Sequence, residues 1–354
     1  MTSALPAITW PDAAREAAFQ RWFTPLAQAR QLAPASLVLA SADASFRRYL
    51  RVTGEGGRSF IVMDAPPPQE AVGPFVDLAQ RIRAAGLHAP EVLAVDAEHG
   101  FVLLADLGNR LYLQALQSAE PAEADRLMRA ALGALLQFQQ RLDRSGLPLY
   151  DEALLRRELA LFPEWCVGRE YGISWTAAQT ATWQRVCDAL VASALAQPQV
   201  PVHRDWMPRN LMLAEPNPGI LDFQDAVIGP ATYDLASLLR DAFLSWDEAQ
   251  EIDWAARWWQ QARAAGILGE HPMAADFGET WRALEWVGLQ RHLKVLGIFC
   301  RLKHRDGKPS YSADLPRFFG YVAKVALRYR DLKPLVALIE PMTGTLTTTA
   351  FTLR

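Results

Sequence analysis

The stretch HRDWMPRN, from His203 to Asn210, gathers an acid, three basic residues and an amide in one short loop between apolar segments. Asn210 lies five residues after Asp205, and Asp222 follows twelve residues later in the stretch ILDFQD. Phosphoryl transfer needs an in-line nucleophile and cations held against the phosphate oxygens. Amide and carboxylate oxygens are ligands that Mg²⁺ accepts. The spacing therefore predicts that Asn210 and Asp222 bind Mg²⁺ and that Asp205 lies beside an acceptor hydroxyl.

A second candidate site precedes it in the stretch SADASFRRYLRV, residues 41–52. A nucleoside triphosphate carries about four negative charges, which donors and cations must offset. The small residues here would let backbone N–H groups approach phosphates, and in view of the downstream loop we expect Ala44, Ser45 and Arg47 to bind the nucleotide. The alternative is a polar hairpin turn with solvated arginines. The sequence contains neither a Walker motif nor a G-x-G-x-x-G motif.

The elements that must position these residues change in type along the chain. Residues 12–31 read as a helix, and short β-type runs occupy residues 36–105. The stretch GEGGR, residues 54–58, predicts a hairpin turn, and residues 74–85 predict a helix before the last two strands. We expect a small sheet with one inserted helix.

After Leu107 the pattern becomes mainly helical. Helical periodicity covers residues 123–142, 151–165, 176–195 and, with interruptions, 233–339. The stretch NLMLAEPNPGILDF predicts strand, turn and strand within this part of the chain. The expected domains are a nucleotide-binding lobe at 1–106, a catalytic and substrate lobe at 107–342, and a tail at 343–354.

Composition limits the class of protein. The chain has 354 residues, of which 51% are hydrophobic, enough for two or three domains. A net charge of −3 argues against nucleic acid or a membrane surface as partner. No run of 18 apolar residues and no signal-peptide pattern occur. We expect a cytoplasmic protein acting on a small molecule; protein partners are not indicated.

Taken together, HRDWMPRN and ILDFQD resemble the catalytic and metal-binding loops of the protein-kinase-like fold, in particular the aminoglycoside-phosphotransferase branch of small-molecule kinases. The resemblance implies an α+β, bilobal fold with a β-rich N-lobe and a mainly helical C-lobe. It implies ATP and Mg²⁺ as cofactors, with Asp205 accepting the proton of the acceptor hydroxyl. His203 would be structural, and Asp234, in YDLASLLRD, would accept hydrogen bonds from amides of the catalytic loop.

The stretch FVLLADLGN, residues 101–109, resembles the segment that connects the two lobes in this fold. Adenine would then bond to backbone groups around Leu104, Asp106 and Leu107. The third strand departs from the family pattern, because Met63 or its neighbour stands where a phosphate-binding lysine is usual, and the chain has no lysine before Lys294. Arginines of the small lobe could substitute, phosphate binding could be weaker, or the protein could be a pseudokinase.

One branch of the family shares this departure. DASFRRYLRV, IVMDAPP, LADLG, RRELALFPEWCVG and LQRHLKVLGIFCRL resemble segments of the bacterial N-acetylmuramate/N-acetylglucosamine anomeric kinases of cell-wall recycling. The likeness covers residues 41–302. It implies phosphorylation of the C1 hydroxyl of an N-acetylated amino sugar, and this assignment rests on family likeness.

Candidate substrate contacts lie on the predicted C-lobe helices and in the loop. Glu158 and Trp165 are seven residues apart on one predicted helix and would share a face. Glu158 could bind sugar hydroxyls or pair with Arg157 in solvent. Trp206 could pack against the sugar or wedge the loop from behind.

Arg291, His292 and Lys294 form a basic cluster in an otherwise apolar helix. Arg291 and His292 are candidates for binding the carboxylate of a muramic acid, and salt bridges to acidic neighbours are the alternative. An aminoglycoside or choline kinase would bind a cationic acceptor, against which this cluster argues. A pseudokinase that only binds nucleotide is the other alternative.

Overall fold

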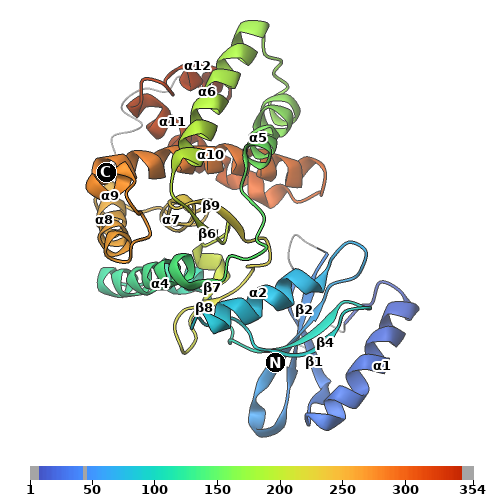
Figure 1. Cartoon of the computed structure of the whole chain (residues 1–354). Coiled ribbons are helices and arrows are strands. Elements are labelled where there is room, and N and C mark those ends of the chain that lie inside the picture. The colour runs from blue at the N-terminus through green and yellow to red at the C-terminus, as the bar shows by residue number, and fades with distance from the viewer. Residues whose placement is uncertain (1–7, 43–45, 345–354) are drawn as a thin grey trace. The chain divides into compact units, whose positions relative to one another are not determined.

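The structure, a computed structural model, describes residues 8–42 and 46–344, and Figure 1 shows the course of the chain. The described residues form two compact units: the chain up to Tyr112 together with Arg209–Asp225, and Leu113–Pro208 together with the chain from Ala226 onward. In order, the helices and strands are α1 (Ala13–Ala29), β1 (Ala33–Ala42), β2 (Arg48–Thr53), β3 (Ser59–Asp64), α2 (Val72–Ala84), β4 (Val92–Asp96), β5 (Phe101–Ala105), α3 (Tyr112–Gln117), α4 (Pro121–Arg141), α5 (Glu152–Leu159), the π-helix η2 (Phe162–Glu170), α6 (Ala177–Ala196), β6 (Gln199–Val202), the 3-10 turn η3 (Pro208–Asn210), β7 (Leu211–Met212), β8 (Gly219–Ile220), β9 (Val227–Pro230), α7 (Tyr233–Leu239), α8 (Glu248–Ala264), α9 (Pro272–Ala275), α10 (Phe277–His304), α11 (Leu315–Arg328) and α12 (Pro334–Thr343).

The first unit is built on a five-stranded antiparallel sheet in the order β1-β2-β3-β5-β4. β2 and β3 pair continuously, with Arg48 opposite Asp64 and Thr53 opposite Ser59. The turn between them places Gly56 and Gly57 at φ 68° and 76°. Glycine adopts such left-handed backbone without a steric penalty. The hairpin predicted from GEGGR is confirmed.

Successive residues of a strand point to opposite faces of the sheet, so each face can be identified from the alternation. One face carries Val62 and Leu103, which form a buried core with Phe19 and Phe23 of α1. Figure 1 shows α1 lying along the sheet. Asp64 belongs to the same face as Val62 and accepts hydrogen bonds from the arginines Arg15 and Arg48. The acid at the end of β3 therefore ties α1 to the sheet.

The hairpin β7-β8 belongs to the first unit by its contacts, although it was expected in the larger lobe. The Ile220 amide donates to the carbonyl of His88 at 2.7 Å, and the Leu213 amide donates to Arg110 at 2.8 Å. The Phe223 ring stacks on Phe75 of α2 with centroids 4.9 Å apart. These backbone bonds join the segment to the chain before Tyr112.

The second unit is mainly helical and is arranged around α10. This helix packs against η2, α6, α7 and α11, and most of its residues are buried. β6 pairs antiparallel with β9, with Val202 opposite Val227, and the loop of interest begins directly after β6. Among the described residues, no helix is long and apolar enough to cross a membrane.

One predicted helix differs in kind. Residues 151–165 were expected to form a single helix with α-helical periodicity. The structure instead ends α5 at Leu159 and continues with η2, whose hydrogen bonds are of the π type. α10 approaches the start of this segment closely because Gly297 has no Cβ, and one there would lie 2.5 Å from the backbone carbon of Leu161. Hydrophobic periodicity predicts a helix here but does not reveal its π-type hydrogen bonding.

Candidate active site

Asp234 holds the backbone of the loop that begins after β6. Its carboxylate accepts hydrogen bonds from the amides of His203, at 2.6 Å, and Arg204, at 2.9 Å. These are the bonds that the family resemblance implied. Asp234 is fully buried at the start of α7, and burial raises its pKa to about 7, against the lowering effect of the two amides. The loop is thus fixed to α7 by its first two residues.

His203 and Trp206 form the buried underside of the loop. His203 is 1% exposed, and its Nδ1 accepts a hydrogen bond from the Asp205 amide at 3.3 Å. Trp206 is fully buried, with its ring 5.6 Å from Phe138 and 5.5 Å from His203, centroid to centroid. The assignment of Trp206 as a sugar contact is therefore corrected: its indole wedges the loop from behind. His203 has the structural surroundings that were expected.

Arg204 adopts φ 76°, a left-handed conformation that costs a non-glycine residue about 1–3 kcal/mol. Its guanidinium donates to Glu158 Oε1 at 2.6 Å. Lys294 Nζ lies 2.9 Å from the same oxygen. The other oxygen, Oε2, accepts hydrogen bonds from Tyr150 and, at 3.3 Å, from Gln290. Glu158 thus anchors the side chain of a strained loop residue.

The role expected of Glu158 is corrected by this network. The carboxylate is 5% exposed, so it faces neither a sugar nor solvent, and its partners are Arg204 and Lys294 rather than Arg157. Burial alone would raise its pKa, but the two cations outweigh burial and lower the pKa to about 2. Glu158 is therefore ionised throughout the physiological range.

Trp165 does not share a helical face with Glu158. Glu158 lies in α5, whereas Trp165 lies in η2, where the residues per turn differ from those of an α-helix. A spacing of seven residues therefore does not place these two side chains on one helical face. Trp165 is partly exposed, and its position does not assign it a ligand.

His292 is likewise not on an open surface. It is fully buried, its ring stacks on Tyr321 at 4.8 Å, and its Nε2 lies 3.3 Å from the carbonyl oxygen of Arg240. Burial, with Arg240 and Arg291 nearby, lowers its pKa well below the ordinary value. A neutral, buried imidazole does not bind a substrate carboxylate, so this assignment is corrected.

Asp205 is the accessible acid of the loop. Its side chain is 39% exposed, and Oδ1 lies 3.8 Å from Nη2 of Arg291, which is 4% exposed. The loop therefore presents one carboxylate to solvent while its neighbours His203 and Trp206 are buried. A partly exposed, fixed carboxylate can accept the proton of a bound hydroxyl.

Asn210 and Asp222 lie together at the two ends of the hairpin β7-β8. Asn210 Nδ2 is 3.5 Å from Asp222 Oδ2, and Gln224 Nε2 donates to Asp222 Oδ1 at 2.9 Å. The backbone amide of Leu221 donates to the carbonyl of Asn210 at 2.9 Å, which closes the hairpin. A half-turn of the Asn210 amide would present its oxygen instead of its nitrogen. An amide and a carboxylate oxygen, with phosphate oxygens and water, fit the preferences of Mg²⁺.

Backbone strain marks both loops. Within residues 8–42 and 46–344, three non-glycine residues have positive φ: Gln31, Arg204 and Asp222, the last at 60°. Of these, Arg204 lies in the HRDWMPRN loop and Asp222 is a proposed metal ligand. Strained backbone persists where the surroundings over-determine it, which is common at functional sites.

Of the residues predicted to bind the nucleotide phosphates, only Arg47 lies within the described part of the chain. Ala44 and Ser45 lie outside the described residues. Arg47 pairs with Glu70, with Nε 2.8 Å from Oε2, and both side chains are largely buried. Glu70, for which the sequence offers no lysine partner in this part of the chain, thus pairs with Arg47.

The segment after β5 has a well-defined turn. Leu104 lies in β5, 2% exposed, between Ile61 and Val92 of the neighbouring strands. The Asp106 carboxylate pairs with Arg51 at 2.5 Å and accepts a hydrogen bond from the Gly108 amide at 2.9 Å. Its side chain therefore shapes the turn, which leaves the backbone groups as candidates for adenine.

Leu107 packs closely on the hairpin, since a Cβ on Gly219 would lie 2.8 Å from its Cδ1. Asp106 and Leu107 also line a cavity of about 400 Å³, together with His88 and Glu91.

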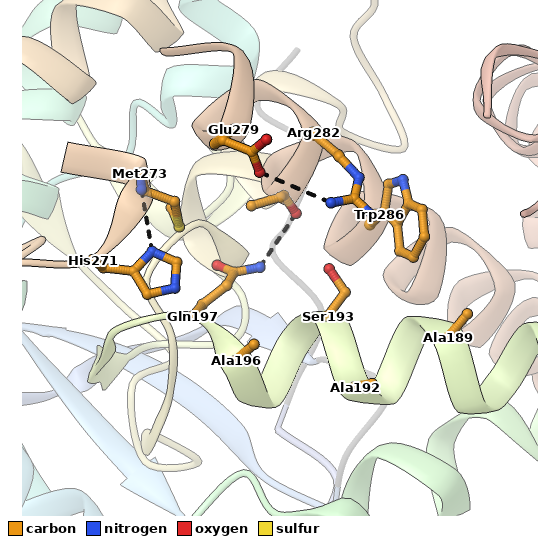
Figure 2. Close-up of a pocket in the computed structure, with 11 residues that line it drawn as sticks. Ala189, Ala192, Ser193, Ala196, Gln197, His271, Met273, Glu279, Arg282 and Trp286 are labelled. Atoms are coloured by element: carbon orange, nitrogen blue, oxygen red, sulfur yellow. Dashed lines mark hydrogen bonds and ion pairs between the residues drawn. The ribbon is translucent and has the colours of Figure 1, made fainter. Parts of the chain in front are cut away.

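A second cavity, of about 360 Å³, lies between α6 and α10 (Figure 2) and includes none of the predicted site residues. Its polar groups are engaged in the fold: His271 accepts from the Met273 amide, Gln197 donates to the Ala283 carbonyl, and Arg282 pairs with Glu279. The cavity is therefore separate from the chemistry proposed for Asp205.

Two contributors to the site were not assigned from the sequence. Lys294 was noted in the basic cluster, but its partner Glu158 was not. Tyr150 was not singled out, although it donates to the same carboxylate. A lysine within an apolar helix is a signal in itself, because buried cations require an acid nearby.

A β-rich unit, a helical unit and a loop carrying Asp205 upstream of Asn210 and Asp222 define a phosphotransferase. The chain belongs to the phosphotransferase enzyme family, which it matches over residues 36–277. It has the protein-kinase-like fold and is an ATP-dependent kinase.

Curated relatives cover most of the chain. One is the N-acetylmuramate/N-acetylglucosamine kinase of Pseudomonas putida, 54% identical over 87% of this chain and 88% of the relative. The proteins of the same name from Pseudomonas aeruginosa and Neisseria meningitidis are 52% and 45% identical, over 88% and 87% of this chain and 90% and 91% of theirs.

Solved structures support the fold. The ADP-bound aminoglycoside phosphotransferase APH(2'')-Ib has a TM-score of 0.58 at 12% identity, covering 89% of this chain and 99% of that one. The choline kinase LicA of Streptococcus pneumoniae has the same TM-score at 10% identity, covering 88% and 99%.

Proposed function

We propose that this protein transfers the γ-phosphoryl group of ATP to the anomeric C1 hydroxyl of N-acetylmuramate and N-acetylglucosamine, as part of peptidoglycan recycling in the cytoplasm. The observation that carries the reaction type is the accessible Asp205 carboxylate on a loop whose neighbouring side chains are buried. The identity of the acceptor is supported by the relatives that are 45–54% identical over most of the chain.

In the proposed reaction, Asp205 accepts a hydrogen bond from the C1 hydroxyl and orients its oxygen toward the γ-phosphorus. A new P–O bond forms to the sugar as the bond between the γ-phosphorus and the bridging oxygen of ATP breaks. ADP leaves with the electron pair, and the hydroxyl proton passes to Asp205 and then to solvent. The products are a sugar 1-phosphate and ADP.

Asn210 and Asp222 are the residues that would hold Mg²⁺, which would neutralise charge on the phosphate oxygens. Arg47 is proposed to contact the nucleotide phosphates, and the backbone around Leu104–Leu107 to bind adenine. The Glu70 carboxylate contributes to holding the Arg47 guanidinium in place, since the two are paired at 2.8 Å.

The cations near Asp205 are matched by acids. Arg204 and Lys294 pair with Glu158, and Arg291 lies 3.8 Å from Asp205. The charge of this cluster therefore favours neither a cationic nor an anionic acceptor, and the choice of an amino sugar rests on the relatives.

A substrate panel tests the proposal. The protein with Mg²⁺-ATP is offered N-acetylmuramate, N-acetylglucosamine, an aminoglycoside and choline, and ³¹P NMR distinguishes a 1-phosphate from a 6-phosphate. We expect the 1-phosphate of the amino sugars. Asp205→Asn should lower kcat by about 10²–10⁴-fold and leave nucleotide binding, measured by calorimetry, unchanged. Nucleotide binding without transfer to any acceptor in the wild type would instead indicate a pseudokinase.

A further inference from the structure

Arg291 lies on α10 directly beside the proposed catalytic base. Its Nη2 is 3.8 Å from Oδ1 of Asp205; the arginine side chain is 4% exposed and the aspartate side chain 39%. Solvent, and therefore a substrate, reaches the carboxylate far more readily than the guanidinium. The structure thus has a buried cation behind an accessible acid.

The other charges of the cluster have their own partners. Glu158 is paired with Arg204 at 2.6 Å and with Lys294 at 2.9 Å. Asp234 accepts hydrogen bonds from the loop amides. Among the ion pairs of the described residues, the carboxylate within 4 Å of Arg291 is that of Asp205. Asp234 fixes the backbone of the loop, and the attraction between Arg291 and Asp205 acts in addition on the Asp205 side chain.

The sequence suggested another role for Arg291, that of binding the lactyl carboxylate of a muramic acid. Its burial argues against this role, because a substrate carboxylate would have to reach past Asp205 and would meet a like charge there. The distance of 3.8 Å is also informative. It exceeds the 2.7–3.2 Å of a direct hydrogen bond, so Arg291 acts on Asp205 through its charge.

We propose that Arg291 is a positioning residue for Asp205, whose carboxylate it holds turned toward the acceptor hydroxyl. This inference rests on the proposed function, in which Asp205 is the base. Because the hydroxyl is common to both amino sugars, the effect of Arg291 is the same for a sugar with a lactyl carboxylate and for one without it.

The test compares Arg291→Met and Arg291→Lys with wild type, using N-acetylmuramate and N-acetylglucosamine as acceptors. We expect Arg291→Met to lower kcat by about 10²-fold for both sugars, as for a misplaced catalytic group, with KM changed less than about threefold. Arg291→Lys, which retains the charge, should restore at least about a tenth of the wild-type kcat. Arg301→Met, on the same helix, is the matched control and should retain the wild-type kcat.

The outcomes separate the alternatives. A rise in KM for N-acetylmuramate alone, with kcat unchanged, would assign Arg291 to the substrate carboxylate and overturn the proposal. An unchanged kcat for both sugars, or equal losses in Arg291→Lys and Arg291→Met, would also overturn it. Binding of a non-hydrolysable ATP analogue verifies the fold of each variant, and Arg291→Gln replaces Arg291→Met if the latter does not fold. Failure of the wild type to phosphorylate either sugar would instead contradict the proposed function.

Discussion

Replacing Glu158 by glutamine removes one charge from the buried cluster and keeps the shape of the side chain. In the folded protein the pKa of Glu158 is lowered from 4.5 to about 2, because Lys294 and Arg204 outweigh the effect of burial. A pKa difference of one unit between the folded and unfolded states corresponds to about 1.4 kcal/mol. Ionisation of Glu158 therefore stabilises the fold by about 3 kcal/mol at neutral pH. We expect Glu158→Gln to lower the free energy of unfolding by about that amount, since two buried cations lose their partner.

The pH dependence has a definite sign. The pKa of Glu158 is lower in the folded state, so its contribution is fully present above the unfolded pKa of 4.5 and is lost as the pH falls toward 2. The difference between wild type and Glu158→Gln should therefore shrink between about pH 4.5 and pH 2. Urea denaturation followed by circular dichroism, at about pH 7 and about pH 3.5, measures it.

A double variant provides the control. Glu158→Gln with Lys294→Met removes one of the two cations that the single variant leaves unpaired, so it should recover part of the lost stability. A loss below about 0.5 kcal/mol in Glu158→Gln at pH 7, or a difference that does not shrink in acid, would refute the reasoning.

Three further predictions concern the nucleotide, the metal and the fold. Arg47→Met should raise KM for ATP by about tenfold and leave KM for the sugar unchanged in steady-state kinetics; a change below about twofold would show that Arg47 does not contact the nucleotide. Asp222→Asn should raise the Mg²⁺ concentration for half-maximal activity by more than about tenfold, and an unchanged Mg²⁺ titration would remove Asp222 from the metal site. Gly297→Ala should lower the free energy of unfolding by about 2 kcal/mol or more, because the new Cβ would lie 2.5 Å from the backbone of Leu161. Gly320→Ala in α11, where a Cβ would meet nothing within 4 Å, is its control and should be neutral or stabilising in thermal unfolding.

The elements and the motif residues could be predicted because their signals are local. The hairpin turn at Gly56 and Gly57 follows from the conformational preferences of glycine. Asp205, Asn210 and Asp222 were selected by residue type and spacing, which fix what chemistry they can perform. Such signals need no knowledge of what packs against them.

Partners that are distant in sequence could not be predicted. Glu158 and Arg204 are 46 positions apart, and nothing in either segment indicates the other. The same holds for Arg47 and Glu70, and for the burial of Trp206 and His292, which packing by other elements determines. The π-helix η2 was not predicted either, because hydrophobic periodicity indicates a helix without specifying its hydrogen-bond type.

The carboxylate of Glu158 also has a consequence for synthesis of the chain. Gln290, one of its partners, lies 132 positions further along, and Lys294 follows shortly after. At about 5–20 residues per second, a ribosome needs on the order of ten seconds to make that interval. The loop with Asp205 is made within this interval, before α10, so Glu158 can pair with Arg204 before Lys294 exists. The full network around Glu158 therefore forms only after α10 has been made.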